Sequence, residues 1–118
     1  MRLVYIAGPF RAKDGWELHQ NILKAERWAW VVAKSGAVPV CPHTLYRHYD
    51  RTLTDTFWIE ATRSLLFRCD AALFVPGWVQ STGAIGEMKM AKELKLPVFS
   101  LEPGMSEDIV ARWLGGEL

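Results

Sequence analysis

Short apolar segments alternate along the chain with longer segments in which apolar residues recur every three or four positions. The short segments, which we expect to be strands, are Leu3 to Ala7, Ala37 to Val40, Ala71 to Val75 and Leu96 to Leu101. The periodic segments, which we expect to be helices, are Gly15 to Lys34, Thr54 or Asp55 to Arg68, residues 82–95 and Ser106 to Leu114. This alternation predicts an α/β fold with a single domain over residues 1–118. Its sheet would be doubly wound, Rossmann- or flavodoxin-like and mainly parallel, with about four to five strands and helices on both faces.

Capping residues and prolines set the bounds of several elements. Asp14 is suited to cap the first long helix at its start, and Gly36 is suited to end it. Pro39 has no backbone N–H to donate, which predicts that its strand lies at an edge of the sheet. Residues 41–53 are expected to form a loop, and Ser106 is expected to cap the last helix.

Composition narrows the class of protein. The chain has 118 residues, a net charge of +1 and 50% hydrophobic residues, which argues against disorder and against a partner that is a nucleic-acid polymer. Two cysteines without a Cys-x-x-Cys pair indicate a reduced, cytoplasmic protein with buried thiols. A disulfide between Cys41 and Cys69 is the alternative that the sequence leaves open. No apolar run approaches the ~20 residues of a membrane span. A strand so close to Met1 leaves no room for a signal peptide.

The first helix carries more apolar surface than one core stripe needs. Its core stripe is expected to be Leu18, Ile22, Ala25, Ala29 and Val32, yet Trp16, Leu23 and Trp30 also recur at seven-residue spacing, with Val31 alongside. One interpretation is a contact between subunits, since monomers seldom expose such patches. The other is a broad core face on a well-covered helix. We expect a homodimer or a higher homo-oligomer.

Two loops are expected to meet at one crevice. In doubly wound sheets, ligands bind beyond the carboxyl ends of the strands where the strand order reverses, between the first and third strands here. The loops at those ends are Gly8-Pro9-Phe10-Arg11 and residues 77–87. The second contains a glycine-rich turn, Ser81-Thr82-Gly83-Ala84-Ile85-Gly86-Glu87, which lacks the Gly-Lys-Ser/Thr of a Walker loop and the Gly-x-Gly-x-x-Gly of dinucleotide sites. A kinase or a dehydrogenase is therefore disfavoured.

Glu87 is the strongest catalytic candidate in these loops. It borders the sheet-facing stripe Ala84, Met88, Ala91 and Leu94 of its helix, and we expect it near the first turn. The helix dipole would favour its ionised form there by a few tenths to ~1 kcal/mol. An ionised carboxylate at the end of a strand is well placed to attack an electrophilic carbon.

Several other polar and aromatic residues have two interpretations. Each is either part of a binding site or an ordinary residue of the core, the surface or a loop. Tyr5 is either a core tyrosine or a site residue, and Arg11 is either a surface arginine or an anion contact. Trp78 is expected to form part of the pocket wall, while Tyr46 and Tyr49 either stack on a base or pack within their loop. Cys41, His43, His48 and Asp50 fit no structural-zinc spacing. We therefore expect no metal and no cofactor.

The segments Tyr5-Ile6-Ala7-Gly8-Pro9-Phe10-Arg11, Cys69-Asp70-Ala71 and Ser81-x-Gly83-x-x-x-Glu87 resemble the nucleoside 2-deoxyribosyltransferase superfamily. That superfamily includes the 2′-deoxynucleoside 5′-monophosphate N-glycosidases, and the chain also resembles a small bacterial and phage branch of it. The resemblance implies that Glu87 attacks C1′ of the sugar and displaces the base, through a covalent glycosyl-enzyme. It implies that Tyr5 orients Glu87 and that Arg11 and Ser81 contact a 5′-phosphate. The substrate-binding set implied is Gly8, Pro9, Phe10, Arg11, Trp78, Ser81, Gly83 and Ala84.

The chain departs from the pattern of the monophosphate hydrolases at three places. Pro9 replaces a serine that serves the phosphate, and Thr62 stands where the hydrolases carry an aspartate that protonates the leaving base. Asp55 or Glu60 would then have to act as the acid. Asp70 is expected to be structural, and Ser106 only weakly matches a serine that reaches a neighbouring subunit's phosphate.

These residues predict cleavage or transfer at the N-glycosidic bond of a (deoxy)nucleoside or its 5′-monophosphate, a small-molecule partner, with water or a second base as acceptor. One alternative is a non-catalytic nucleotide-binding or sensing module on the same fold. Another is a phosphoribohydrolase that acts on ribonucleotides.

Overall fold

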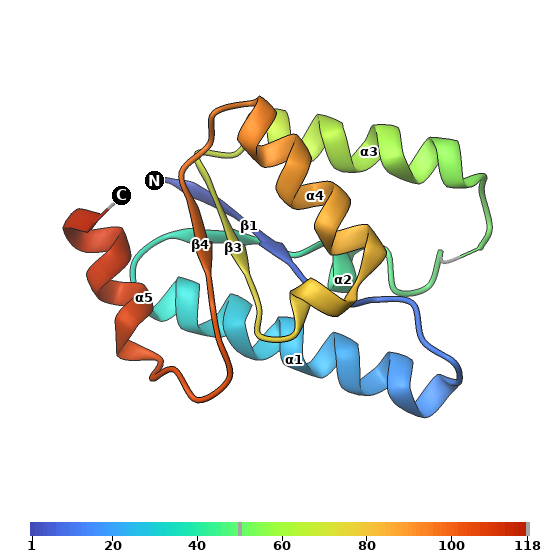
Figure 1. Cartoon of the computed structure of the whole chain (residues 1–118), viewed down its shortest axis with the longest axis horizontal. Helices are drawn as coiled ribbons and strands as arrows, with labels where there is room; N and C mark the ends of the chain where they lie inside the picture. The colour runs from blue at the N-terminus through green and yellow to red at the C-terminus, as the bar shows by residue number, and fades with distance from the viewer. Residues whose placement is uncertain (50, 118) are drawn as a thin grey trace.

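A four-stranded parallel sheet lies at the centre of the computed structural model, which describes residues 1–49 and 51–117 (Figure 1). Within these residues the sheet order is β2-β1-β3-β4. The strands are β1 (Leu3–Ala7), β2 (Val38–Val40), β3 (Ala71–Phe74) and β4 (Val98–Ser100). This is a flavodoxin-like order in which the direction of winding reverses between β1 and β3. The predicted fold class is confirmed.

Helices cover both faces of the sheet. α1 (Gly15–Lys34) and α5 (Asp108–Arg112) pack on one face, and α3 (Asp55–Arg68) and α4 (Thr82–Glu93) pack on the other (Figure 1). Three short elements were not expected from the sequence: α2 (Pro42–Leu45) in the 41–53 segment, the 3₁₀ turn η1 (Trp78–Gln80), and the π-helical turn η2 (Trp113–Glu117) after α5. No helix in the described residues is long and apolar enough to cross a membrane.

Alternation of side chains along β1 divides the core into two layers. Val4 and Ile6 pack with residues of α1 and α5, whereas Tyr5 and Ala7 pack with Leu66 of α3 and with residues of α4. Tyr5 is wholly buried, at 0% exposed. The position of Tyr5 in the strand therefore directs its ring to the face that also carries Glu87.

Local capping bonds explain the helix bounds. The Asp14 carboxylate accepts from the Glu17 N–H at 2.8 Å, and the Thr54 hydroxyl oxygen accepts from the Phe57 N–H at 3.1 Å, so Thr54 rather than Asp55 caps α3. Gly36 follows α1 with φ +95°, as its capping role requires. The predicted Ser106 cap is wrong: Glu107 is at the N-cap of α5, and the Ser106 hydroxyl donates to Asp108.

β2 is an edge strand, as its proline predicted. Val4 is paired with Pro39, and the Val38 N–H donates to the Arg2 carbonyl at 2.9 Å. Alternation along the strand then directs the N–H positions of Val38 and Val40 toward β1 and that of Pro39 toward the open edge. Pro39 thus occupies a place where no ladder bond is lost.

Asp70 ties the start of β3 to β1, which confirms its structural role. Its carboxylate accepts from the Leu3 N–H at 2.7 Å, and its own N–H donates to the Leu3 carbonyl at 2.8 Å. Cys41 and Cys69 are both buried free thiols, as expected.

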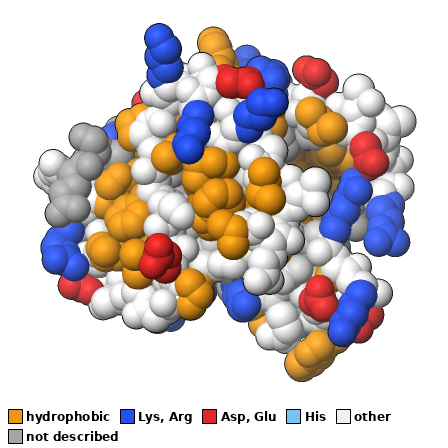
Figure 2. Space-filling view, in the orientation of Figure 1, with side chains coloured by type: hydrophobic (Ala, Val, Ile, Leu, Met, Phe, Trp, Pro, Cys, Tyr) orange, Lys and Arg blue, Asp and Glu red, His pale blue; other side chains and the backbone are white. Residues whose placement is uncertain are grey.

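The apolar residues outside the core stripe of α1 are exposed. Trp16 is 74%, Leu23 42% and Trp30 55% exposed, whereas Val31 is buried. The interpretation of these three positions as a broad core face is therefore wrong. Elsewhere, Figure 2 shows hydrophobic side chains gathered over the middle of the face on which α4 and β4 lie, with lysines and arginines around them.

Candidate active site

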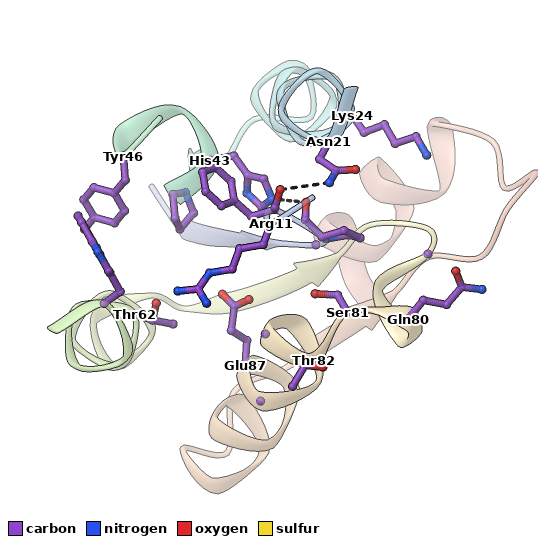
Figure 3. Close-up of a pocket in the computed structure, with 18 of the residues that line it drawn as sticks. Arg11, Asn21, Lys24, His43, Tyr46, Thr62, Gln80, Ser81, Thr82 and Glu87 are labelled. Carbon is purple, nitrogen blue, oxygen red and sulfur yellow. Dashed lines mark hydrogen bonds between the residues drawn. The ribbon is translucent and has the colours of Figure 1, made fainter. Parts of the chain in front are cut away.

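A cleft of about 1390 Å³ opens beyond the carboxyl ends of β1 and β3 (Figure 3). It is lined by Gly8 to Arg11 after β1, by residues of the segment 76–87 after β3, and by side chains of α1, α2 and α3. The two loops singled out in the sequence do converge on it. The cleft is larger than a typical small-molecule pocket of ~300–1,000 Å³, so it has room for more than one chemical group of a ligand.

Close packing at Gly8 brings the two loops together. A Cβ built on Gly8 would lie 2.3 Å from Cγ2 of Val75, the buried residue that follows β3. Real Cβ contacts are essentially never this short, and a buried valine has little freedom to move aside. Only glycine therefore fits at the end of β1 in this arrangement.

Glu87 and Tyr5 form a hydrogen-bonded pair at the floor of the cleft. The Tyr5 hydroxyl donates to Glu87 Oε2 and so joins β1 to α4 across 82 positions of sequence. Burial first, and then the neighbouring Glu87 charge, raise the pKa of Tyr5 well above its ordinary value. Tyr5 therefore stays protonated and acts as a donor to Glu87.

The protonation of Glu87 differs from the expectation. Glu87 lies in the second turn of α4, beyond the first-turn N–H groups, and is partly buried. Burial raises its pKa from 4.5 to about 7, while the hydrogen bond from Tyr5 acts in the opposite direction. Removal from water therefore outweighs the helix dipole, which was expected to favour the ionised form of Glu87.

Thr62 completes the polar group around Tyr5. It lines the cleft from α3, and hydrogen bonding from its side chain lowers the pKa of Tyr5, against the larger effects of burial and Glu87. A threonine hydroxyl is not an acid at neutral pH, but it can donate to the Tyr5 oxygen and leave the Tyr5 proton for Glu87. Sequence reasoning gave Thr62 no role.

Arg11 and Asp55 form an ion pair at the mouth of the cleft. The Arg11 guanidinium donates to Asp55 Oδ1, and both side chains are mostly exposed. The pair joins the β1–α1 loop to the start of α3. From the sequence, Arg11 was expected to contact a phosphate and Asp55 was a candidate acid. Nothing in the sequence indicated that their side chains meet.

Several predicted site residues do line the cleft: Tyr5, Gly8, Pro9, Phe10, Arg11, Asp55, Ser81, Gly83 and Glu87. Three others do not. Trp78 packs on Phe74 and its indole N–H donates to Ser100 at 2.7 Å, so it is directed toward β4. Ala84 is wholly buried, and Glu60 lies on an exposed face of α3 outside the cleft. Their predicted places in the site are wrong.

The α2 and α3 side of the cleft carries an aromatic wall, of which the sequence had indicated only Phe10 and, as one of two interpretations, Tyr46. We use this name for Phe10, His43, Tyr46 and Trp58, all of which line the cleft. The His43 and Phe10 rings meet edge to face at 5.4 Å, and the Tyr46 and Trp58 rings lie 4.9 Å apart. Trp58 precedes Thr62 by one helical turn, and that spacing was the available signal for its place in the wall.

Metal binding finds no support in the described residues. No group of three or more His, Cys, Asp or Glu side chains among them could hold an ion. His43 instead donates from Nε2 to the Pro9 carbonyl at 2.9 Å, and burial lowers its pKa. His48 and Tyr49 are exposed and outside the cleft, and Asp50 lies outside the described residues.

Comparisons with known proteins agree with this architecture. The fold is similar to that of a 2-deoxyribosyltransferase from the psychrotolerant bacterium Bacillus psychrosaccharolyticus, with a TM-score of 0.61 and 19% sequence identity over 92% of this chain and 79% of that one. At this identity the similarity shows the fold alone. No curated protein matches the chain in sequence. A family model described as a domain of unknown function, DUF7768, matches residues 2–101, and the chain therefore belongs to that family.

Proposed function

We propose that the chain cleaves or transfers the N-glycosidic bond of a (deoxy)nucleoside or its 5′-monophosphate. The observation that carries this proposal is the Tyr5–Glu87 pair at the floor of a ligand-sized cleft. A carboxylate with one oxygen held by a buried donor has its other oxygen available for attack. The fold shared with a 2-deoxyribosyltransferase supports the same class of reaction.

In the proposed reaction, the Glu87 carboxylate bonds to the anomeric carbon of the sugar while the bond from that carbon to the base nitrogen breaks. The electron pair of the broken bond leaves with the base, and the sugar remains as an ester of Glu87. Water or a second base then attacks the same carbon and releases Glu87. With a pKa of about 7, Glu87 is substantially ionised at neutral pH and can begin this cycle.

The Arg11–Asp55 pair suggests how a phosphate would affect the site. An anionic group that takes the Arg11 guanidinium competes with Asp55 for it. Asp55 would then be released toward the cleft, where it could take up a proton from solvent water and pass that proton to the departing base. We therefore propose the 5′-monophosphate as the better substrate, with Ser81 as a second phosphate contact from the start of α4.

The decisive experiment is incubation of the protein with a panel of ribo- and deoxyribonucleosides and their 5′-monophosphates, followed by chromatography of the free bases. We expect release of base by wild type and none by Glu87→Gln. Release that persists in Glu87→Gln would refute the assigned nucleophile. Preference for ribonucleotides would identify a phosphoribohydrolase instead.

A non-catalytic nucleotide-binding module is the second candidate, because Thr62 provides no carboxylic acid for the leaving base. It predicts tight binding of a nucleotide with no free base formed over long incubation. Calorimetric titration of wild type with each member of the same panel distinguishes the two functions.

A further inference from the structure

Tyr5, His43 and Thr62 line the cleft but have no proton available for a leaving base. The Tyr5 hydroxyl already donates its proton to Glu87, and burial raises the pKa of Tyr5 well above its ordinary value. His43 donates from Nε2 to the Pro9 carbonyl at 2.9 Å, and burial lowers its pKa, so the ring is neutral at pH 7 and has no second proton. The hydroxyl of Thr62 is not an acid at neutral pH.

The carboxyl groups at the mouth of the cleft are engaged as well. Asp55 is in an ion pair with Arg11. Glu17 is in an ion pair with Lys13 at 4.0 Å, and its N–H donates to the Asp14 carboxylate at 2.8 Å. Carboxyl groups in such contacts are ionised at neutral pH and carry no proton. Apart from the proposed nucleophile itself, the described part of the cleft therefore presents no carboxylic acid and no imidazolium to a departing base.

Glu87 has no counter-ion in the cleft. Within the described residues it accepts a hydrogen bond from Tyr5 but makes no ion pair, and no neighbouring cation lowers its pKa. Three of the four described lysines and arginines that line the cleft pair with carboxylates: Arg11, Lys13 and Arg63. The fourth, Lys24, extends away from Glu87 (Figure 3). A carboxylate that is partly removed from water without a cation beside it is stabilised by a ligand that brings a positive charge.

We propose that the preferred substrates carry a cationic base, a quaternised nitrogen heterocycle such as a pyridinium or an N7-alkylpurine. This inference rests on the proposed function. A Glu87 carboxylate oxygen bonds to the anomeric carbon while the bond from that carbon to the base nitrogen breaks. The electron pair of the broken bond passes to the base and cancels its positive charge, so the base leaves as a neutral molecule without a proton. A neutral base would leave as an anion unless Asp55 had first left Arg11 and delivered a proton.

The test compares two nucleotides that differ by one methyl group and one positive charge. They are guanosine 5′-monophosphate and 7-methylguanosine 5′-monophosphate, each in its ribo and 2′-deoxyribo form, and nicotinamide mononucleotide adds a pyridinium. Chromatography measures the released bases, after subtraction of release without protein, for wild type, Asp55→Asn, Thr62→Asp and Thr62→Asn. Thr62→Asp introduces a carboxyl group into the cleft, and Thr62→Asn is its matched control, because asparagine has a similar size and is not an acid.

We expect wild type to release 7-methylguanine roughly a hundredfold faster than guanine, or more, because a general acid typically contributes a factor of this size. Asp55→Asn should slow the release of guanine but not that of 7-methylguanine. Thr62→Asp, unlike Thr62→Asn, should accelerate the release of guanine alone. The proposal is overturned if wild type releases both bases equally fast, or if the substitutions at Asp55 and Thr62 change both rates alike. Circular dichroism confirms that each variant is folded.

The two cationic substrates identify the class of heterocycle. Release from nicotinamide mononucleotide but not from either form of 7-methylguanosine 5′-monophosphate would identify a pyridinium, and the reverse would identify an alkylpurine. Either result supports the preference for a cationic base.

Ligands without a glycosidic bond separate this inference from the proposed function. Nicotinamide and 1-methylnicotinamide differ by one methyl group and one positive charge. Their binding to wild type and Glu87→Gln is followed by ligand-observed NMR at pH 8, above the Glu87 pKa of about 7. We expect 1-methylnicotinamide to bind wild type roughly tenfold more tightly than nicotinamide does, and Glu87→Gln to bind both alike. Release of no base from any nucleotide would refute the proposed function, whereas equal binding of the two ligands by wild type would overturn the cationic preference.

Discussion

Replacing Glu87 with glutamine should stabilise the folded protein at alkaline pH. Burial raises the Glu87 pKa from 4.5 to about 7, so the folded state binds this proton more tightly than the unfolded state does. Between those two values the folded protein holds more protons, and the free energy of unfolding therefore falls as pH rises. Glutamine has a similar shape and carries no charge at any pH. The free energy of unfolding of the Glu87→Gln variant therefore does not fall with pH for this reason.

The size of the effect follows from the same two values. Relative to a side chain that does not titrate, ionisation of Glu87 costs ~1 kcal/mol at pH 5 and ~3 kcal/mol at pH 8.5, because each tenfold change in protonation is worth ~1.4 kcal/mol. Compared with wild type, the Glu87→Gln variant should therefore gain ~2 kcal/mol of stability between these pH values.

Urea unfolding followed by tryptophan fluorescence at pH 5 and pH 8.5 measures this difference. Glu60→Gln, on the exposed face of α3, is the control and should change the free energy of unfolding by a similar small amount at both pH values. A Glu87→Gln variant whose advantage over wild type is the same at pH 5 and pH 8.5 would show that Glu87 is not held out of water and would refute this reasoning.

Three further predictions follow from the site and the surface. If Glu87 is the nucleophile, the rate of base release should rise with pH and level off above about 7; Tyr5→Phe should lower the rate and move this rise to higher pH, because the Tyr5 hydrogen bond favours the ionised carboxylate. Gly8→Ala should reduce the free energy of unfolding by ~1–3 kcal/mol in urea titrations through its clash with Val75, and a second substitution, Val75→Ala, should recover part of the loss. If the exposed stripe of α1 joins two copies of the chain, Trp30→Glu should convert an oligomer to a monomer in sedimentation velocity, whereas a wild type that is already monomeric would refute that contact.

Residues close in sequence to each helix or strand predicted the main helices and strands well. The bounds of α1 follow from the Asp14 cap and from Gly36, and these act within a few residues of the positions that they define. The strands β1 and β3 and the loops after them were equally clear, because a buried parallel strand needs a continuous apolar run. The meeting of those loops then follows from topology alone.

The electrostatics of the site could not be predicted in the same way. The pKa of Glu87 depends on how completely β1, α3 and α4 exclude water, and the Arg11–Asp55 pair joins residues 44 positions apart. The aromatic wall depends on the fold of the 41–53 segment, where no periodic pattern marks the short α2 helix. Trp78 shows the converse error, since its loop reaches the cleft while its ring turns toward β4.

The proline in β2 has a consequence for how molecules of this chain can associate. Of the three residues in β2, only Pro39 directs its backbone nitrogen away from the sheet, and that nitrogen has no hydrogen to give. An incoming strand from another copy would find no N–H donor among the residues of β2, which disfavours the growth of a continuous intermolecular sheet from this edge. Aggregation by strand addition is thereby disfavoured on one flank of the molecule, where ordered assembly would depend mainly on side chains.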